Sequence, residues 1–168
     1  PDGALYWLAK MINAGEDPLF IARRLVIAAS EDIGMARPEA LSVAIAAQQA
    51  VHFLGMPEAR IPLAEATVYL AAAPKSNSAY LGLESALSDI RDRPNEPVPL
   101  HLRNAVTDLM SNMDYGKGYK YDHEYEGRFS GQQYLPPSVQ GKRYYMPTDE
   151  GDESSVKDRL INLWGGNG

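Results

Sequence analysis

Residues 46–80, AAQQAVHFLGMPEARIPLAEATVYLAAAPKSNSAY, decide the fold class of this chain. Apolar residues recur every three or four positions up to Gly55 and again from Pro62, which is the period of an amphipathic α-helix. Gly55 suits a helix C-cap, and Pro74 disfavours helix in the residue before it. The stretch therefore predicts one helix that ends at Gly55 and a second that runs from Pro62 to Pro74. The predicted buried stripe of the first helix comprises Leu41, Ala44, Ile45, Ala47, Val51 and Leu54.

The same period continues outward from this stretch in both directions. Asp17 followed by Pro18 places an N-cap before a proline at the first helical position. The many alanines on these helices allow close approach of helix axes, although they also raise helix propensity. The predicted helices of this part of the chain cover residues 4–13, 17–33, 38–54, 62–73 and 78–91.

The composition changes after Arg93, where three prolines predict an extended connector before a short helix at residues 104–112. Residues 115–147 hold seven of the ten tyrosines, with many glycines and prolines and no sustained period. Disordered segments are poor in aromatic residues, so we expect irregular or short-strand structure that packs on the helices. A last helix is predicted at residues 154–164.

The chain is therefore predicted to be mainly α, a helical bundle with an irregular Tyr/Gly/Pro-rich segment and a C-terminal helix. We divide it into a helical domain at residues 1–114 and an extension at residues 115–168 that packs on the same domain. The sequence opens without Met and directly in helical pattern, so we expect further protein upstream.

Charge and composition narrow the classes of function. A formal net charge of -6 argues against a domain whose whole surface binds nucleic acid, while a local basic patch remains open. The absence of cysteine excludes disulfides and thiolate zinc sites and is typical of a reducing cytoplasm. No apolar run approaches the roughly 18 residues that a membrane-spanning helix needs, so we expect no membrane partner.

No constellation for catalysis or metal binding emerges, so no catalytic, cofactor or metal residue is assigned. The sequence lacks the G-x-x-x-x-G-K-[ST] loop that cradles nucleotide phosphates. Asp122, His123 and Glu124 are consecutive and do not converge on one ion, so they favour a solvated turn. Glu31 and Asp32 point about 100 degrees apart on a helix, which disfavours an acid–base pair.

The segment YGKGYKY at residues 115–121 leaves two interpretations open. Lysines on phosphates and tyrosines stacked on bases are typical of single-strand binders. The acidic DHEYE that follows at residues 122–126 favours a structural hairpin with packed tyrosines instead. The candidate DNA-contact residues are Lys117, Tyr119, Lys120, Tyr121, Lys142 and Arg143.

Several long strings resemble, in order and spacing, the C-terminal region of the MgsA/RarA family of AAA+ ATPases, which is related to the Werner helicase-interacting protein. They are ALYWLAKMINAGEDPLFIARRLVIAASEDIG, the opening stretch, VPLHLRNA, YGKGYKYDHEY and GKRYYMPTDEG. The resemblance covers essentially the whole chain. Family-characteristic positions without a known role are Pro74, Lys75, Ser76, Asn77, His101, Arg103 and Asn104.

The resemblance implies a helical collar domain that assembles subunits, in this family as tetramers, behind an N-terminal clamp-loader-like AAA+ module. ATP and Mg would belong to that module, and the full-length protein would be a DNA-stimulated ATPase at stalled forks. It further implies a nucleoid-associated cytoplasmic protein with DNA and single-strand DNA-binding protein as partners. This fragment itself is expected to have no enzymatic activity.

Three hypotheses follow for the function of the chain. The first is an oligomerisation domain, which the small-residue helices and the resemblance favour. The second is a DNA-contacting module that uses the Tyr/Lys-rich segment at residues 115–145. The third, an independent hydrolase with paired carboxylates, has little support because no acidic or histidine residues form a recognisable set.

Overall fold

The computed structural model describes residues 1–165, which form two compact units. Unit 1 contains residues 1–83 and 145–157, and unit 2 contains residues 84–144 and the chain from residue 158. All regular structure in residues 1–165 is helical, and this part of the chain contains no β-strand. The predicted mainly-α fold class is therefore confirmed, and residues 115–147 are irregular. The predicted domain boundary after residue 114 stays a prediction.

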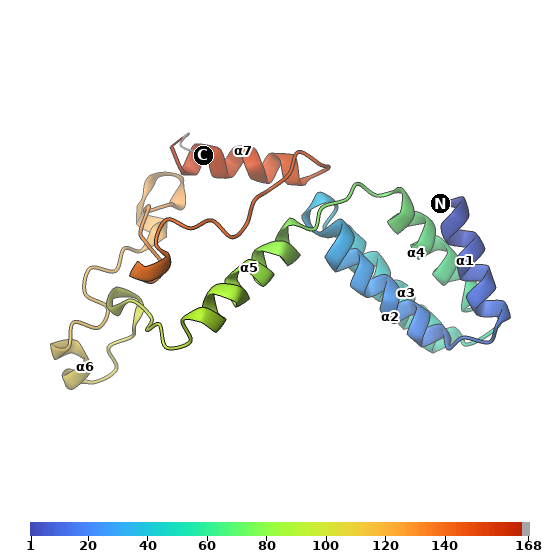
Figure 1. Cartoon of the computed structure of the whole chain (residues 1–168), viewed down its shortest axis with the longest axis horizontal. Helices are drawn as coiled ribbons and strands as arrows, with labels where there is room; N and C mark the ends of the chain where they lie inside the picture. Colours follow the sequence, from blue (N-terminus) through green and yellow to red (C-terminus); the bar gives the residue numbers. More distant parts are fainter. Residues whose placement is uncertain (166–168) are drawn as a thin grey trace. The chain divides into compact units, whose positions relative to one another are not determined.

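Four helices make the body of unit 1 (Figure 1). They are α1 (Asp2–Asn13), α2 (Pro18–Ala28), α3 (Glu39–Leu54) and α4 (Arg60–Ala72). Helix α3 packs between α2 and α4, and α1 packs on α4. The predicted cap of α2 is confirmed, because the Asp17 carboxylate accepts a hydrogen bond of 3.1 Å from the Leu19 amide.

Two predicted helices of unit 1 differ from the structure at one end, for reasons visible in their local contacts. The second predicted helix leaves the α-helical path at Ala29 and continues as a π-helical turn, η1 (Ala29–Ile33), and a 3-10 turn, η2 (Gly34–Ala36). The Ser30 hydroxyl lies 3.3 Å from the Val26 carbonyl oxygen, a side-chain bond that competes with the helical ladder. Helix α4 begins at Arg60, which places Pro62 in the first turn, where its missing N–H is not needed.

The core of unit 1 consists of two clusters in which alanines pack beside larger apolar residues. The first contains Leu8, Ile21, Ala22, Val51, Ala59 and Leu63, and the second contains Ala29, Ile33, Ala40, Ala44 and Leu70. The predicted stripe of α3 is right for Ala44, Ala47 and Val51. It is wrong for Leu41, Ile45 and Leu54, which are exposed because the neighbouring helices approach α3 along its alanines.

Unit 2 is mostly irregular. It begins within α5 (Ser78–Asp92), continues through short helical turns and the one-turn helix α6 (Asp108–Asn112), and takes up α7 (Glu153–Leu163) after residue 157. The intervening turns are η3 (Leu100–Leu102), η4 (Asp122–Glu124), η5 (Glu126–Arg128) and η6 (Pro137–Val139). Helix α6 is shorter than predicted, since the Thr107 hydroxyl caps it by accepting a 3.3 Å bond from the Met110 amide.

Candidate functional site

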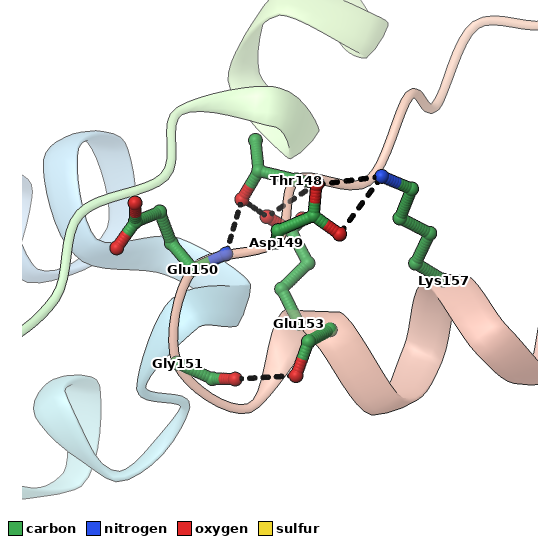
Figure 2. Close-up of polar contacts among 7 residues, drawn as sticks. Thr148, Asp149, Glu150, Gly151, Glu153 and Lys157 are labelled. Carbon is green, nitrogen blue, oxygen red and sulfur yellow. Dashed lines mark hydrogen bonds and ion pairs between the residues drawn. The ribbon is translucent and has the colours of Figure 1, made fainter.

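A fully buried carboxylate lies where the returning segment 145–157 meets the rest of unit 1. Glu153, the first residue of α7, is 0% exposed. Its Oε1 accepts hydrogen bonds from the Ser78 hydroxyl and, at 2.7 Å, from the Tyr145 hydroxyl. Its Oε2 accepts from the Thr148 amide at 3.1 Å and the Thr148 hydroxyl at 2.6 Å (Figure 2). A buried charge is tolerated here because four donors surround it.

The hydrogen bonds outweigh the effect of burial on this carboxyl. Burial alone would raise the pKa of Glu153, but the hydroxyls of Ser76, Ser78, Thr148 and Tyr145 hold that pKa at about 2. Burial, reinforced by the bond to this carboxylate, raises the pKa of Tyr145 to about 12. The cluster therefore holds a permanent negative charge near neutral pH, which fits a structural role and not proton transfer.

Two glycines allow the segment 74–77 to lie against its neighbours. A Cβ at Gly34 would stand 2.7 Å from the Ser76 carbonyl oxygen, and Gly34 has φ +48°. A Cβ at Gly151 would stand 2.7 Å from the Pro74 ring and would overlap the Ala36 carbonyl oxygen, which accepts a 2.8 Å hydrogen bond from the Asp152 amide. The family-characteristic segment 74–77 is thus fixed from both sides by backbone that only glycine permits.

The individual residues of segment 74–77 serve the local fold. The Lys75 ammonium donates to the carbonyl oxygens of Leu70 at 2.8 Å and Ala73 at 2.5 Å, which caps the C-terminus of α4. Ser76 accepts from the Ser78 amide at 3.3 Å and donates to its hydroxyl at 3.0 Å. Asn77 is exposed.

The second family-characteristic segment organises unit 2. His101 Nε2 lies 2.8 Å from the Gln133 carbonyl oxygen. The Arg103 guanidinium donates to the Val98 carbonyl at 2.7 Å and to the Tyr115 hydroxyl at 3.1 Å. These bonds tie the proline-rich connector to the irregular segment, whereas Asn104 is exposed.

The candidate DNA-contact residues all lie in unit 2, and most of their cations are engaged within the chain. The Lys142 ammonium lies 2.6 Å from both Asp89 carboxylate oxygens, and the Lys117 ammonium lies 2.9 Å from Asp114. The Arg143 guanidinium stacks 3.6 Å from the Trp164 ring centroid. Tyr119, Lys120 and Tyr121 are exposed. Their assignment as DNA contacts stays a prediction.

Asp89 is the centre of the polar contacts of α5 in unit 2. The hydrogen bond from Lys142, followed by the 2.9 Å bond from the Tyr144 hydroxyl, lowers the pKa of Asp89. Neither Asp89 nor Glu153 was singled out by sequence reasoning. Glu153 lies in the acidic run TDEGDESS at residues 148–155, which is typical of a solvated loop, so no local signal marks it as buried.

Asp122, in the acidic turn Asp122–Glu124, holds the following loop through hydrogen bonds to its carboxylate. Asp122 accepts bonds from the Ser130 amide at 2.9 Å and the Tyr134 hydroxyl at 2.7 Å, and these contacts lower its pKa.

Within residues 1–165 no three His, Cys, Asp or Glu side chains are grouped to hold a metal ion. In the same range, no helix has both the length and the apolar character needed to cross a membrane.

Helix α5 has an inverted distribution of side chains. At about 100° per residue, Ser78, Gly82, Ala86 and Asp89 share one side of the helix, and all four are buried or half-buried. The opposite side carries the α5 ridge, which we define as Tyr80, Leu83, Leu87 and Ile90. These residues are 43%, 59%, 37% and 58% exposed. Small and polar residues thus face the chain itself, while large apolar residues face solvent.

Comparison with known proteins identifies the family. The family model described as "MgsA AAA+ ATPase C terminal" matches residues 1–164. The chain belongs to this family. The resemblance in the sequence is thereby confirmed over residues 1–164 of the chain.

Relatives of this MgsA C-terminal domain occur in bacteria and eukaryotes. It is 48% identical over 164 residues to "Replication-associated recombination protein A" of Escherichia coli, covering 97% of this chain and 37% of the relative. The Bacillus subtilis protein of the same name is 45% identical, with 95% of this chain and 39% of the relative covered. "ATPase WRNIP1" of Dictyostelium discoideum is 43% identical over 141 residues, with 83% and 16% covered. The chain spans less than two fifths of the length of these relatives.

Proposed function

We propose that this chain is the oligomerisation domain, in tetramers, of an AAA+ ATPase that acts in replication, recombination and repair at stalled forks. The observation that carries the proposal is the α5 ridge, because a helix that turns its large apolar residues to solvent lacks a partner. The ridge residues follow one another at spacings of three, four and three, the a/d pattern by which helices pack on helices.

The energetics favour assembly but require more than this ridge. Full burial of a large apolar side chain contributes about 1.5–3 kcal/mol, and the four ridge residues are already partly covered. Association has to overcome an estimated 4–15 kcal/mol of lost translational and rotational freedom. The ridge of one α5 is therefore a sufficient driving force only when the surface that receives it is also apolar.

The role in replication and recombination rests on family membership and on the names of the relatives. The sequence has no phosphate-binding loop of its own, so we assign ATP and Mg to another part of the polypeptide. DNA and a single-strand DNA-binding protein are proposed as partners of the whole protein. In this view the chain organises a motor whose chemistry resides elsewhere.

Light scattering coupled to gel filtration tests the oligomerisation proposal. We expect the 18.5 kDa chain to elute near four times its mass at micromolar concentration. Leu83→Ser combined with Ile90→Ser should reduce the mass to that of the monomer without loss of helicity. The matched control is Val106→Ser with Leu109→Ser, which removes two residues that are 75% and 70% exposed outside α5. A monomeric wild-type chain would contradict the proposal.

A further inference from the structure

We propose that the α5 ridge of one copy docks into the apolar groove between α1 and α4 of a second copy. The inference rests on the proposed oligomerisation function and names the surface that receives the ridge. The contact would be heterologous, because the two surfaces differ, and repetition of a heterologous contact generates a ring when the rotation closes.

The groove is an apolar receiving surface on unit 1. It has a volume of about 610 Å³ and is lined by Leu5, Leu8, Ala9, Ile12, Asn13, Arg60, Ile61 and Ala64. Leu5, Leu8 and Ile12 form one line along α1, and Ile61 and Ala64 form the facing line on α4. Ile61 is 64% exposed although it is a large apolar residue. An amphipathic helix in such a groove is a recurrent mode of recognition.

The dimensions of the two surfaces agree. With a rise of about 1.5 Å per residue, the line from Leu5 to Ile12 is about 10 Å long and the ridge from Tyr80 to Ile90 is about 15 Å long. The groove thus accepts about three successive ridge residues. Ala64 and Ala9 are small, which leaves room for large side chains of the incoming helix.

The charges beside the two surfaces are complementary. Arg60 lines the groove as the first residue of α4, where the helix dipole disfavours a positive charge and favours an added carboxylate. Glu84 follows Leu83 directly and borders the ridge. Within the described chain, neither Arg60 nor Glu84 takes part in an ion pair. Docking of the ridge would supply Arg60 with the carboxylate that its own chain does not provide.

A pairing of α5 with α5 fits less well. An antiparallel pair that sets Leu83 against Leu87 brings the two Glu84 side chains to the same edge of the seam. Like charges repel there, whereas the groove presents Arg60 to Glu84. The ridge and the groove are therefore better partners for each other than the ridge is for itself.

Charge reversal in the whole chain tests the pairing. Arg60→Glu alone and Glu84→Arg alone should each weaken association about tenfold, measured by sedimentation over a concentration series. The double variant should return to within about twofold of wild type. Arg24→Glu is the matched control, because Arg24 is an exposed arginine on α2 outside the groove.

Engineered cysteines distinguish the docking partner directly, since the chain has no cysteine of its own. A mixture of Leu83→Cys chains and Ala64→Cys chains should form the mixed disulfide under mild oxidation. Predominant Leu83→Cys homodimers would overturn the groove assignment in favour of α5 pairing. If the wild-type chain is multimeric but the Arg60→Glu/Glu84→Arg double variant does not regain association, the docking inference is wrong. The proposed oligomerisation function then still stands. A monomeric wild type would overturn both the inference and the proposed function.

Discussion

The hydroxyl of Ser78, the first residue of α5, donates a hydrogen bond to the buried carboxylate of Glu153, the first residue of α7. The two residues are 75 positions apart in the sequence. The start of the helix that carries the exposed ridge is therefore held by the segment that returns late in the chain.

Glu153→Gln should lower the free energy of unfolding by about 3 kcal/mol. The amide group presents donor hydrogens to surrounding groups that are themselves donors, and removal of a buried hydrogen-bonded charge leaves its partners unsatisfied. Urea denaturation followed by circular dichroism measures the change. Glu150→Gln is the control, because Glu150 is exposed on the same loop and should change stability by less than about 0.5 kcal/mol. Equal stability of the two variants would contradict a supporting role for Glu153.

The depressed pKa of Glu153 predicts loss of stability in acid. Above about pH 4.5 the carboxyl is ionised in both the folded and the unfolded chain, so its contribution is fully present. As the pH falls from 4.5 towards 2, the Glu153 carboxyl becomes protonated in the unfolded chain but stays ionised in the folded chain, so the free energy of unfolding decreases. The difference between about 2 and 4.5 corresponds to about 3 kcal/mol. The free energy of unfolding is measured against pH for the wild type and for Glu153→Gln, and the difference between the two curves isolates the contribution of Glu153 from that of other carboxylates. Parallel curves would contradict the prediction.

Gly151→Ala should destabilise the chain by about 2 kcal/mol more than Gly15→Ala does. Both glycines have positive φ, +53° and +80°, so both substitutions strain the backbone. The added Cβ overlaps the Ala36 carbonyl oxygen only at Gly151, while nothing lies within 4 Å at Gly15. Thermal unfolding of the two variants separates overlap from strain. Identical melting temperatures would show that segment 145–157 does not lie against η2 as described.

The DNA-contact hypothesis predicts unequal effects of its basic residues. Lys120→Ala should weaken binding of forked or single-stranded DNA and reduce the slope of log affinity against log salt by about one. Lys142→Ala should have a smaller effect, since its charge is already matched by Asp89. Fluorescence anisotropy at several salt concentrations measures both. Absence of binding at low salt would exclude this role for the chain.

The sequence predicts a helix end correctly where that end is set by residues within one turn of it. Asp17 and Pro18 fix the start of α2, and Gly55 fixes the end of α3, because capping acts within one turn. The departure from α-helix at Ala29 was not predictable in this way. Apolar spacing continues through it, and the competing Ser30 bond is visible only in the structure.

Local sequence pattern does not predict the hydrogen bonds around Glu153 or the direction in which the α5 ridge faces. Glu153 looks like one more acid in a solvated run, and its burial depends on Ser78, Tyr145 and Thr148 meeting in space. Periodicity predicts that α5 has an apolar side. It does not tell which side of α5 is covered by the rest of the chain, and the structure shows that the covered side is the one with Ser78 and Gly82.

The separation of Ser78 from Glu153 in the sequence also determines when their hydrogen bond can form during translation. At about 5–20 residues per second, a ribosome adds the 75 residues that follow Ser78, up to and including Glu153, in roughly 4–15 s. During that interval α1 to α4 can fold while the Ser78 hydroxyl still lacks its acceptor. The first turn of α5 therefore stays unsecured until the segment that carries Glu153 has left the exit tunnel.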